Sequence, residues 1–231
     1  MLESKYGKVL TVILVIVVIG VLVLLGFLGY DVYKKYTSDK AVAEVMNEFD
    51  STIANSAIIE SSNSIVENTV VQLENVVTGD VTTGGGSSSG ESSSHVVQYE
   101  GYNVVGKIEI PAIDLDYPIL ERTTPESIEL AVAILYTANG LNQPGNTLIV
   151  GHNYRSGAFF GNNDKLQVND KVYITDMSGT RIKYNIYNIY ETSAEDGDFI
   201  MRDTNGKREI SLSTCTNNSK ARLIIWAVEE E

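Results

Sequence analysis

The sequence predicts a mainly β domain over residues 99–231, folded as a closed or nearly closed barrel. Short apolar runs that alternate with polar residues, and turn signals between the runs, support this prediction. Seven or eight short strands in about 130 residues, with only minor helix, are typical of a barrel. Strands are expected at residues 104–110, 115–120, 147–152, 171–175, 180–190, 208–214 and 221–228.

Short elements between these strands can also be expected. Residues 125–132 follow Thr124, a suitable N-cap, and begin with a proline, so they predict a short helix. Residues 156–166 predict another, with Phe159, Phe160 and Leu166 packed against the buried strand. Pro118 predicts an edge or a bend in its strand, and residues 177–179 predict a hairpin turn.

The N-terminal part predicts a membrane anchor. Residues 9–28 carry no charge, and 20 residues at about 1.5 Å rise would cross the ~30 Å apolar core of a bilayer. A cleaved signal peptide has a shorter apolar region, about 7–15 residues, and is the less favoured interpretation. We therefore expect a cytoplasmic segment 1–8, a single-pass anchor 9–30 and an extracellular C-terminal domain.

Residues 31–98 are expected to link the anchor to the barrel. Within them, residues 37–60 predict a helix with Ser38 or Asp39 as N-cap. Its apolar side chains recur at helical spacing: Val42, Val45, Met46, Phe49 and Ile53. Residues 61–98 are rich in Ser, Gly, Asn and Thr and predict a flexible tether.

The charge of the chain excludes one class of partner. The formal net charge is −13, and Lys34 with Lys35 forms the largest basic cluster. Nucleic-acid binding requires basic stripes that neutralise phosphates, so no nucleic-acid partner is expected.

Three side chains indicate chemistry. Cys215 is the only cysteine, so it cannot form an internal disulfide, and Arg222 follows seven residues later. His152, one of two histidines, closes the apolar run 147–152. A thiol, an imidazole and a guanidinium can together perform cysteine acyl transfer. The alternatives are a buried packing thiol, a hydrogen-bonded core histidine and a surface arginine. His95 lies in the linker and is expected to be solvated.

Several motifs in order resemble one family. They are Gly-Lys-Ile-Glu-Ile-Pro at 106–111, Pro-Gly-Asn at 144–146 leading to Gly151-His152, Asn-Asp-Lys-Val at 169–172, and Leu-Ser-Thr-Cys at 212–215 with Arg222. In this order they resemble the sortases, membrane-anchored cysteine transpeptidases of Gram-positive bacteria. The resemblance covers roughly residues 99–231 and implies an eight-stranded β-barrel. One departure is Asn169, where many members have glycine; asparagine also tolerates a left-handed conformation.

The resemblance implies a role for each residue. Cys215 would attack a sorting-signal peptide with an LPXTG-like motif to form a thioacyl-enzyme, and His152 would protonate the leaving amine. An ordinary thiol is mostly protonated at neutral pH, and the family uses the minor fraction of enzyme that holds thiolate and imidazolium together. Arg222 would bind the substrate carbonyl or the developing oxyanion. An amine of the cell wall or a lysine of another protein would then resolve the thioester.

No cofactor is required by this chemistry. Some sortases bind calcium beside a loop that corresponds to the acidic segment containing Glu191, Glu195, Asp196 and Asp198. A solvated turn is the favoured interpretation of this segment, and no metal ligand is assigned. In the family this loop also lines the substrate groove, so Ala194 and Ile200 are candidates for selecting the sorting motif.

The class within the family stays open between types A, D and E. Residues 191–211 are too few for the long helix of class B, and residues 61–98 contain no proline for a class C lid. Two rival functions also stay open. One is a cysteine hydrolase of the same fold that uses water, and the other is a non-catalytic anchored barrel for adhesion or assembly.

Overall fold

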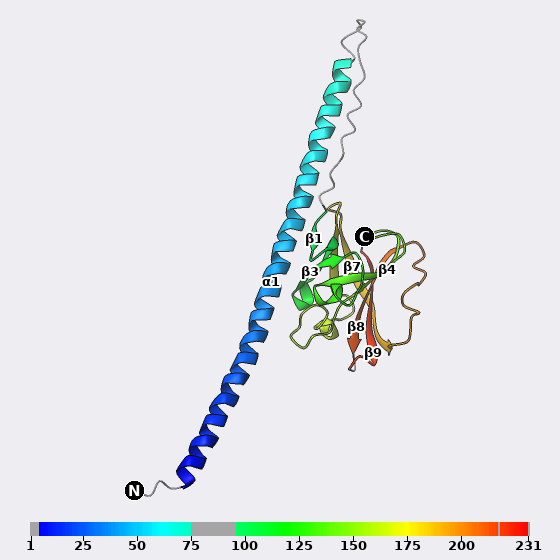
Figure 1. Ribbon diagram of the computed structural model, residues 1–231. Coiled ribbons are helices and arrows are strands. Elements are labelled where there is room, and N and C mark those ends of the chain that lie inside the picture. The colour runs from blue at the N-terminus through cyan, green and yellow to red at the C-terminus, as the bar shows by residue number, and fades with distance from the viewer. Residues whose placement is uncertain (1–4, 75–95, 217, 231) are drawn as a thin grey trace. The chain divides into compact units, whose positions relative to one another are not determined.

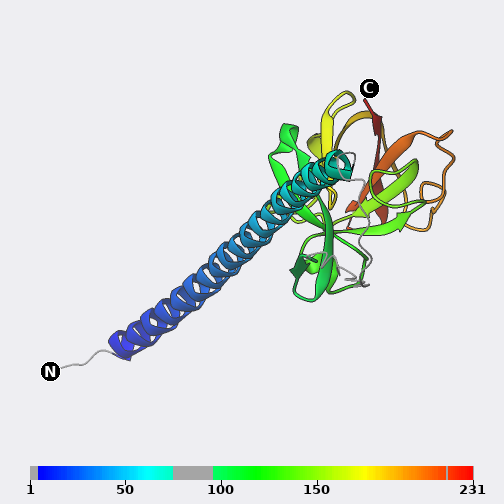
Figure 2. The ribbon, with the colours of Figure 1, turned by 90° about the horizontal axis from the view of Figure 1, so that it is seen from above.

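The computed structural model describes residues 5–74, 96–216 and 218–230. The chain divides into two compact units, Met1–Ala43 and Glu44–Glu231. The second unit contains the β domain, whose strands curl around a common interior (Figures 1 and 2). Its strands are β1 (Gln98–Tyr99), β2 (Tyr102–Ile110), β3 (Leu115–Leu120), β4 (Val132–Thr137), β5 (Gly145–Val150), β6 (Lys171–Asp176), β7 (Arg181–Ser193), β8 (Arg208–Thr216) and β9 (Ala221–Glu229).

The sheet closes on itself. Its strand order is β1-β2-β3-β4-β5-β8-β9-β7-β6, and β2 also pairs antiparallel with β6. Strands β2 to β9 therefore form a closed eight-stranded barrel, and β1 is a two-residue addition to β2. Closure leaves no long unpaired edge among these strands. The predicted barrel and its seven predicted strands are confirmed, whereas β4, the eighth strand of the barrel, was not predicted.

The proline in β3 lies where one side of the strand is unpaired. Pro118 faces Lys107 of β2, whereas β4 pairs only with Ile119 and Leu120. A proline has no N–H to donate, so it is tolerated at a position of β3 that β4 does not reach. The predicted edge character is therefore local to this residue.

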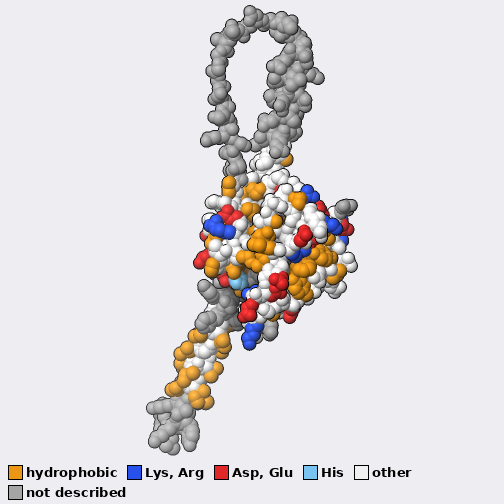
Figure 3. Space-filling model, turned by 90° about the vertical axis from the view of Figure 1, so that its right-hand side faces the viewer, with side chains coloured by type: hydrophobic (Ala, Val, Ile, Leu, Met, Phe, Trp, Pro, Cys, Tyr) orange, Lys and Arg blue, Asp and Glu red, His pale blue; other side chains and the backbone are white. Residues whose placement is uncertain are grey.

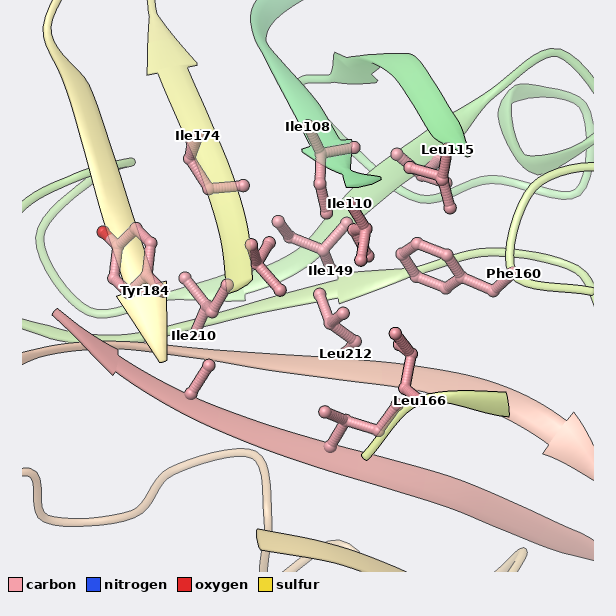
Figure 4. Packing of buried hydrophobic residues seen from close by; sticks show 14 of the residues in the cluster. Ile108, Ile110, Leu115, Ile149, Phe160, Leu166, Ile174, Tyr184, Ile210 and Leu212 are labelled. Carbon is pink, nitrogen blue, oxygen red and sulfur yellow. The ribbon is translucent and has the colours of Figure 1, made fainter. Parts of the chain in front are cut away.

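The interior of the barrel is filled by branched aliphatic and aromatic side chains. Ile108, Ile149, Ile210 and Phe160 are each at most 1 % exposed. Figure 4 shows side chains from β2, β5 and β8 pointing toward one another. Along each strand these residues alternate with residues on the outer surface, because successive side chains of a strand point to opposite faces.

The two helices predicted between strands are shorter than expected. Residues 125–132 contain one 3₁₀ turn, η2 (Ser127–Glu129), because Val132 already begins β4 and pairs with Ile119. Residues 156–166 contain only η3 (Asn163–Lys165). Phe159, Phe160 and Leu166 are nevertheless buried in the core as predicted.

One long helix, α1 (Lys5–Glu74), precedes the barrel. It continues without a break through residues 38 and 39, so neither is an N-cap, and it extends past the predicted end at residue 60. Within the residues that the structure describes, no helix has a stretch both long and apolar enough to cross a membrane. The transmembrane anchor predicted over residues 9–30 is therefore not confirmed, although these residues are helical. Residues 75–95 of the predicted tether lie outside the described residues.

The predicted apolar pattern of residues 37–60 is confirmed in part, because Ile53 is only half-buried. Val42, Val45, Met46 and Phe49 are all less than 10 % exposed. In the second unit, Asp50 accepts a hydrogen bond of 2.8 Å from Nζ of Lys107 on β2.

Candidate active site

Three adjacent strands bring the predicted residues to one face of the barrel. Strand β5 pairs parallel with β8, and β8 pairs antiparallel with β9. Along β8, Ile210 and Leu212 point into the core, so Cys215 lies on the outer face. Cys215 is half-buried and free of a disulfide. A partly exposed thiol on a rigid strand is accessible to a substrate, which the buried packing alternative would not allow.

Arg222 lies directly opposite Cys215. The two residues are cross-strand partners in the β8–β9 register, and partners of an antiparallel pair share a face. Arg222 Nη1 donates hydrogen bonds to the carbonyl oxygens of Ser219 at 3.3 Å and Ala221 at 3.2 Å. These hydrogen bonds hold the guanidinium at backbone carbonyls of the β8–β9 connection.

His152 lies two residues after the end of β5, at the level of Cys215 along the neighbouring strand. Val150 pairs with Ser213, so the parallel register continues to place His152 at the level of Cys215. The connection is hydrogen-bonded to β8. Gly151 N donates to the carbonyl of Ser213 at 3.3 Å, and Asn153 Nδ2 donates to the carbonyl of Cys215 at 2.8 Å. The side chain of His152 remains 29 % exposed, so a substrate can reach it.

The glycine before His152 is required by close packing. A Cβ at Gly151 would lie 2.9 Å from Cγ1 of Val132 and 3.0 Å from Cδ2 of Phe160. The carbonyl oxygen of Gly151 accepts a hydrogen bond of 2.7 Å from Oγ1 of Thr214, which fixes the backbone next to the thiol strand. The segment Gly151-His152 is thus hydrogen-bonded to the segment Thr214-Cys215.

We expect Gly151→Ala to destabilise the barrel by about 1–3 kcal/mol, since the added methyl group overpacks the core. The free energy of unfolding in urea can be followed by the fluorescence of Trp226, the single tryptophan, which lies on β9. Gly197→Ala is the matched control, because its Cβ would meet only Ile200 Cδ1 at 3.7 Å. Equal stability of Gly151→Ala and the wild type would contradict this packing argument.

A second apolar cluster lies on the outer side of β5 and β9 and includes a residue of the loop 194–207. Leu148 of β5, Ile224 of β9 and Phe199 of the loop 194–207 form a buried cluster. Partly buried side chains pack against it: Tyr136, Val150, Tyr190, Ile200 and Trp226. Figure 3 shows exposed apolar side chains gathered in patches on one face of the barrel. An extended peptide with apolar side chains could lie on such a surface.

A buried polar network attaches the loop 194–207 to this face. Asn146 Nδ2 of β5 donates to the carbonyl oxygens of Phe199 at 3.3 Å and Ile200 at 2.9 Å. Nearby, Arg202 Nη1 lies 2.5 Å from Oε2 of Glu209, and the two side chains are 11 % and 10 % exposed. The guanidinium also lies 4.5 Å from the centroid of the Trp226 ring.

Tyr187 completes this network. Its hydroxyl donates to Glu209 at 2.7 Å and accepts from Arg202 at 2.9 Å. Burial, and then the hydrogen bond to Glu209, raise the pKa of Tyr187 to about 12, so the hydroxyl stays protonated at neutral pH. This network could not be predicted from the sequence, because its members are far apart along the chain and lack a motif.

Arg202→Met is expected to cost about 3–5 kcal/mol of unfolding free energy, because it leaves the Glu209 carboxylate buried without its cation. The control is Arg208→Met, which breaks a more exposed pair with Glu229, where the side chains are 39 % and 27 % exposed. That pair should contribute at most about 1 kcal/mol. Urea unfolding measures the free energy of unfolding of both variants. A similarly small loss in Arg202→Met and Arg208→Met would contradict the claim that Arg202 and Glu209 form a buried ion pair.

The acidic loop behaves as a turn. Thr192 Oγ1 donates to the Asp196 carboxylate, and Asp198 N donates to it at 2.9 Å. These hydrogen bonds lower the pKa of Asp196, the side-chain bond more than the backbone one. Among the described residues, no group of three or more His, Cys, Asp or Glu side chains could hold a metal ion.

One neighbour of His152 was not anticipated from the sequence. The Glu129 carboxylate, on η2, lies 3.1 Å from His152 Nε2 and accepts a hydrogen bond of 2.5 Å from the Tyr154 hydroxyl. Glu129 is 23 residues before the histidine, in a segment predicted to be helix, and no spacing rule connects the two.

The closed barrel with a thiol, an imidazole and a guanidinium on one outer face has the composition of a cysteine acyl-transfer enzyme. The family model of the sortase domain matches residues 108–230, more than half of the chain. The chain therefore belongs to the sortase family, a family of cysteine transpeptidases.

Relatives and solved structures agree with this assignment. Sortase A of Bacillus anthracis is 29 % identical over 125 residues, which are 52 % of this chain and 58 % of that protein. The chain thus matches less than two thirds of the length of this curated relative.

Among solved structures, a Clostridium perfringens sortase D5 transpeptidase is 28 % identical with a TM-score of 0.51, over 55 % of this chain and 79 % of its own. Sortase A of Corynebacterium diphtheriae is 29 % identical with a TM-score of 0.51, over 56 % of this chain and 62 % of its own. Sortase C-1 of Actinomyces oris is 25 % identical with a TM-score of 0.52, over 55 % of this chain and 72 % of its own. Types A, C and D all occur among these neighbours, so the predicted A, D or E class is not confirmed.

Proposed function

We infer that the chain is a transpeptidase that cleaves an LPXTG-like sorting signal and transfers its acyl part to an amine. The observation that carries this inference is that Cys215 and Arg222 are cross-strand partners on β8 and β9, while His152 follows the end of β5, the other neighbour of β8. The catalytic domain is proposed to span residues 99–231 and to act at the cell surface, as sortases do. The peptide substrate is a sorting signal of a surface protein, and the amine comes from the cell wall or from a lysine of another protein.

In the first half of the reaction, the Cys215 sulfur attacks the carbonyl carbon of the threonine of the signal. Arg222 donates hydrogen bonds to the carbonyl oxygen, on which negative charge develops. The C–N bond then breaks, and the leaving amine takes a proton from the His152 imidazolium. The products are a thioacyl-enzyme and the released C-terminal peptide.

The second half reverses these proton movements. The incoming amine attacks the thioester carbon and gives a proton to the neutral His152 ring. The C–S bond breaks, and the Cys215 thiolate forms again. Water in place of the amine would make the same site a hydrolase, so the acceptor must be identified by experiment.

Mass spectrometry of the products tests this proposal. The purified full-length chain is incubated with a panel of LPXTG-like peptides, with and without a glycine or diamino-acid amine, and Cys215→Ala is the control. We expect cleavage after the threonine and joining to the amine, both absent in the control. Free acid as the only product at every amine concentration would favour the hydrolase. No cleavage of any peptide by the folded chain would favour a non-catalytic barrel.

A further inference from the structure

The Glu129 carboxylate lies between two rings of the site. Its Oε1 atom is 3.1 Å from His152 Nε2, and its Oε2 atom accepts the 2.5 Å hydrogen bond from Tyr154. The two rings lie side by side, with centroids 5.0 Å apart and planes inclined by 42°. His152 Nε2 is buried from solvent, and its approach to Glu129 is a charge contact that lacks the alignment of a hydrogen bond.

The turn that carries Glu129 is fixed by its own hydrogen bonds. Ser127 N donates to Oγ1 of Thr124 at 3.0 Å, and Thr124 N donates to Oγ of Ser127 at 2.8 Å. Ser127 Oγ also donates to the carbonyl of Arg122 at 2.9 Å, and Ser127 is fully buried. These bonds hold the backbone of η2 at the end of β3, so the position of the Glu129 backbone is defined.

Tyr154 holds the carboxylate from its other side. Burial, followed by the hydrogen bond to Glu129 and the charge of Glu129, raises the pKa of Tyr154 to about 12. The phenol therefore remains a donor throughout the neutral range. With Oε2 engaged by this donor, Oε1 is directed at His152.

We propose that Glu129 is a positioning residue that holds the proton of His152 on Nε2, so that Nδ1 exchanges the proton with the substrate amine. This inference rests on the proposed role of His152 as the acid. When the C–N bond of the signal breaks, Nδ1 gives its proton to the leaving nitrogen, and the neutral ring keeps the Nε2 proton beside Glu129. In the second half, Nδ1 accepts the proton of the incoming amine.

The loss of kcat expected for Glu129→Ala depends on how exposed the Glu129 side chain is. A fully buried carboxylate that orients a catalytic histidine can be worth about 10⁴-fold in rate. Glu129 is 56 % exposed, and solvent screens an exposed charge. We therefore expect a loss of about tenfold in kcat for Glu129→Ala, with KM unchanged, since the residue acts on proton transfer and touches no part of the peptide.

The variants are compared in the full-length chain. Glu129→Asp should recover part of kcat, because it keeps the carboxylate. Glu126→Ala is the matched control, an exposed acid three residues earlier in the same turn, and should retain wild-type kcat. An equal loss of kcat in Glu126→Ala and Glu129→Ala would overturn the proposal. Such a result would mean that any acidic side chain of this turn has the same effect, so that the contact of Glu129 with His152 is not the cause.

Nitrogen NMR of the imidazole ring gives a readout that does not require activity. The chain has only two histidines, so His95→Ala leaves His152 as the only source of ring signals. We expect the neutral ring to carry its proton on Nε2, and Glu129→Ala to shift it to a mixture of tautomers. Unchanged ring signals in Glu129→Ala would overturn the proposal.

The two inferences fail in distinguishable ways. Full activity of His152→Ala would reject His152 as the acid and would thus reject the proposed mechanism itself. Loss of activity in His152→Ala together with unchanged kcat in Glu129→Ala would leave the mechanism standing and reject the role of Glu129.

Discussion

Replacing Cys215 with alanine is expected to abolish turnover and to leave the barrel folded. The variant removes the sulfur that would form the thioacyl-enzyme, and no second cysteine exists to replace it. Removal of a catalytic nucleophile typically costs at least about 10⁴-fold, so the rate should fall to the detection limit. The measurement is the initial rate of peptide cleavage at equal concentrations of wild type and variant.

The folded state of this variant decides what a loss of activity means. Cys215 is half-buried near the end of β8, and its side chain lies outside the main core. Its truncation should therefore change the free energy of unfolding by little, as measured by the fluorescence of Trp226 in urea. An unfolded variant would identify the thiol as a packing residue, and retained turnover would exclude Cys215 as the nucleophile.

Replacing His152 with alanine is expected to lower kcat/KM for peptide cleavage by about 10²–10⁴-fold, because the leaving amine then has no positioned acid. A thioester substrate should lose much less, since its thiolate leaves without a proton. His95→Ala is the control and should retain wild-type activity, because the sequence places this histidine in the linker. Equal losses on peptide and thioester would contradict a role as the acid of the leaving group.

The barrel was predictable because most of its strands are short apolar runs, several of which alternate with polar residues. Ile210 and Leu212 on the core side of β8 alternate with Ser211 and Ser213 on the outer side, a pattern visible in the sequence alone. The turn at residues 177–179 was also predictable, and Gly179 has the expected positive φ of 80°. Asn169, which follows the expectation that asparagine tolerates a left-handed conformation, has a positive φ of 79°.

The lengths of the short helices were overestimated for a physical reason. Residues 125–132 have a helical N-terminal signature, but the parallel pairing of Val132 with Ile119 draws the chain into the barrel. Local propensity at such a junction is weaker than tertiary pairing. The single 3₁₀ turn that remains is the one that carries Glu129 to the site.

Part of the candidate site was open to prediction and part was not. Cys215 and His152 are rare residue types in this chain, and Arg222 follows Cys215 in a recognisable motif. The strand register places Cys215 opposite Arg222 and β5, which ends just before His152, beside β8. Their supporting groups carry no such signal. Glu129 and Arg202 are common surface residue types, and only the fold places them beside His152 and Glu209.

The most direct measurement is the mass of the enzyme during turnover. The full-length chain is mixed with an LPXTG-like peptide in the absence of amine, quenched in acid, and examined intact and after proteolytic mapping. We predict a mass increase equal to the peptide acyl part ending at threonine, located on Cys215 and discharged when amine is added. Cleavage of the peptide without an adduct on Cys215, or with an adduct on another residue, would contradict the proposed mechanism.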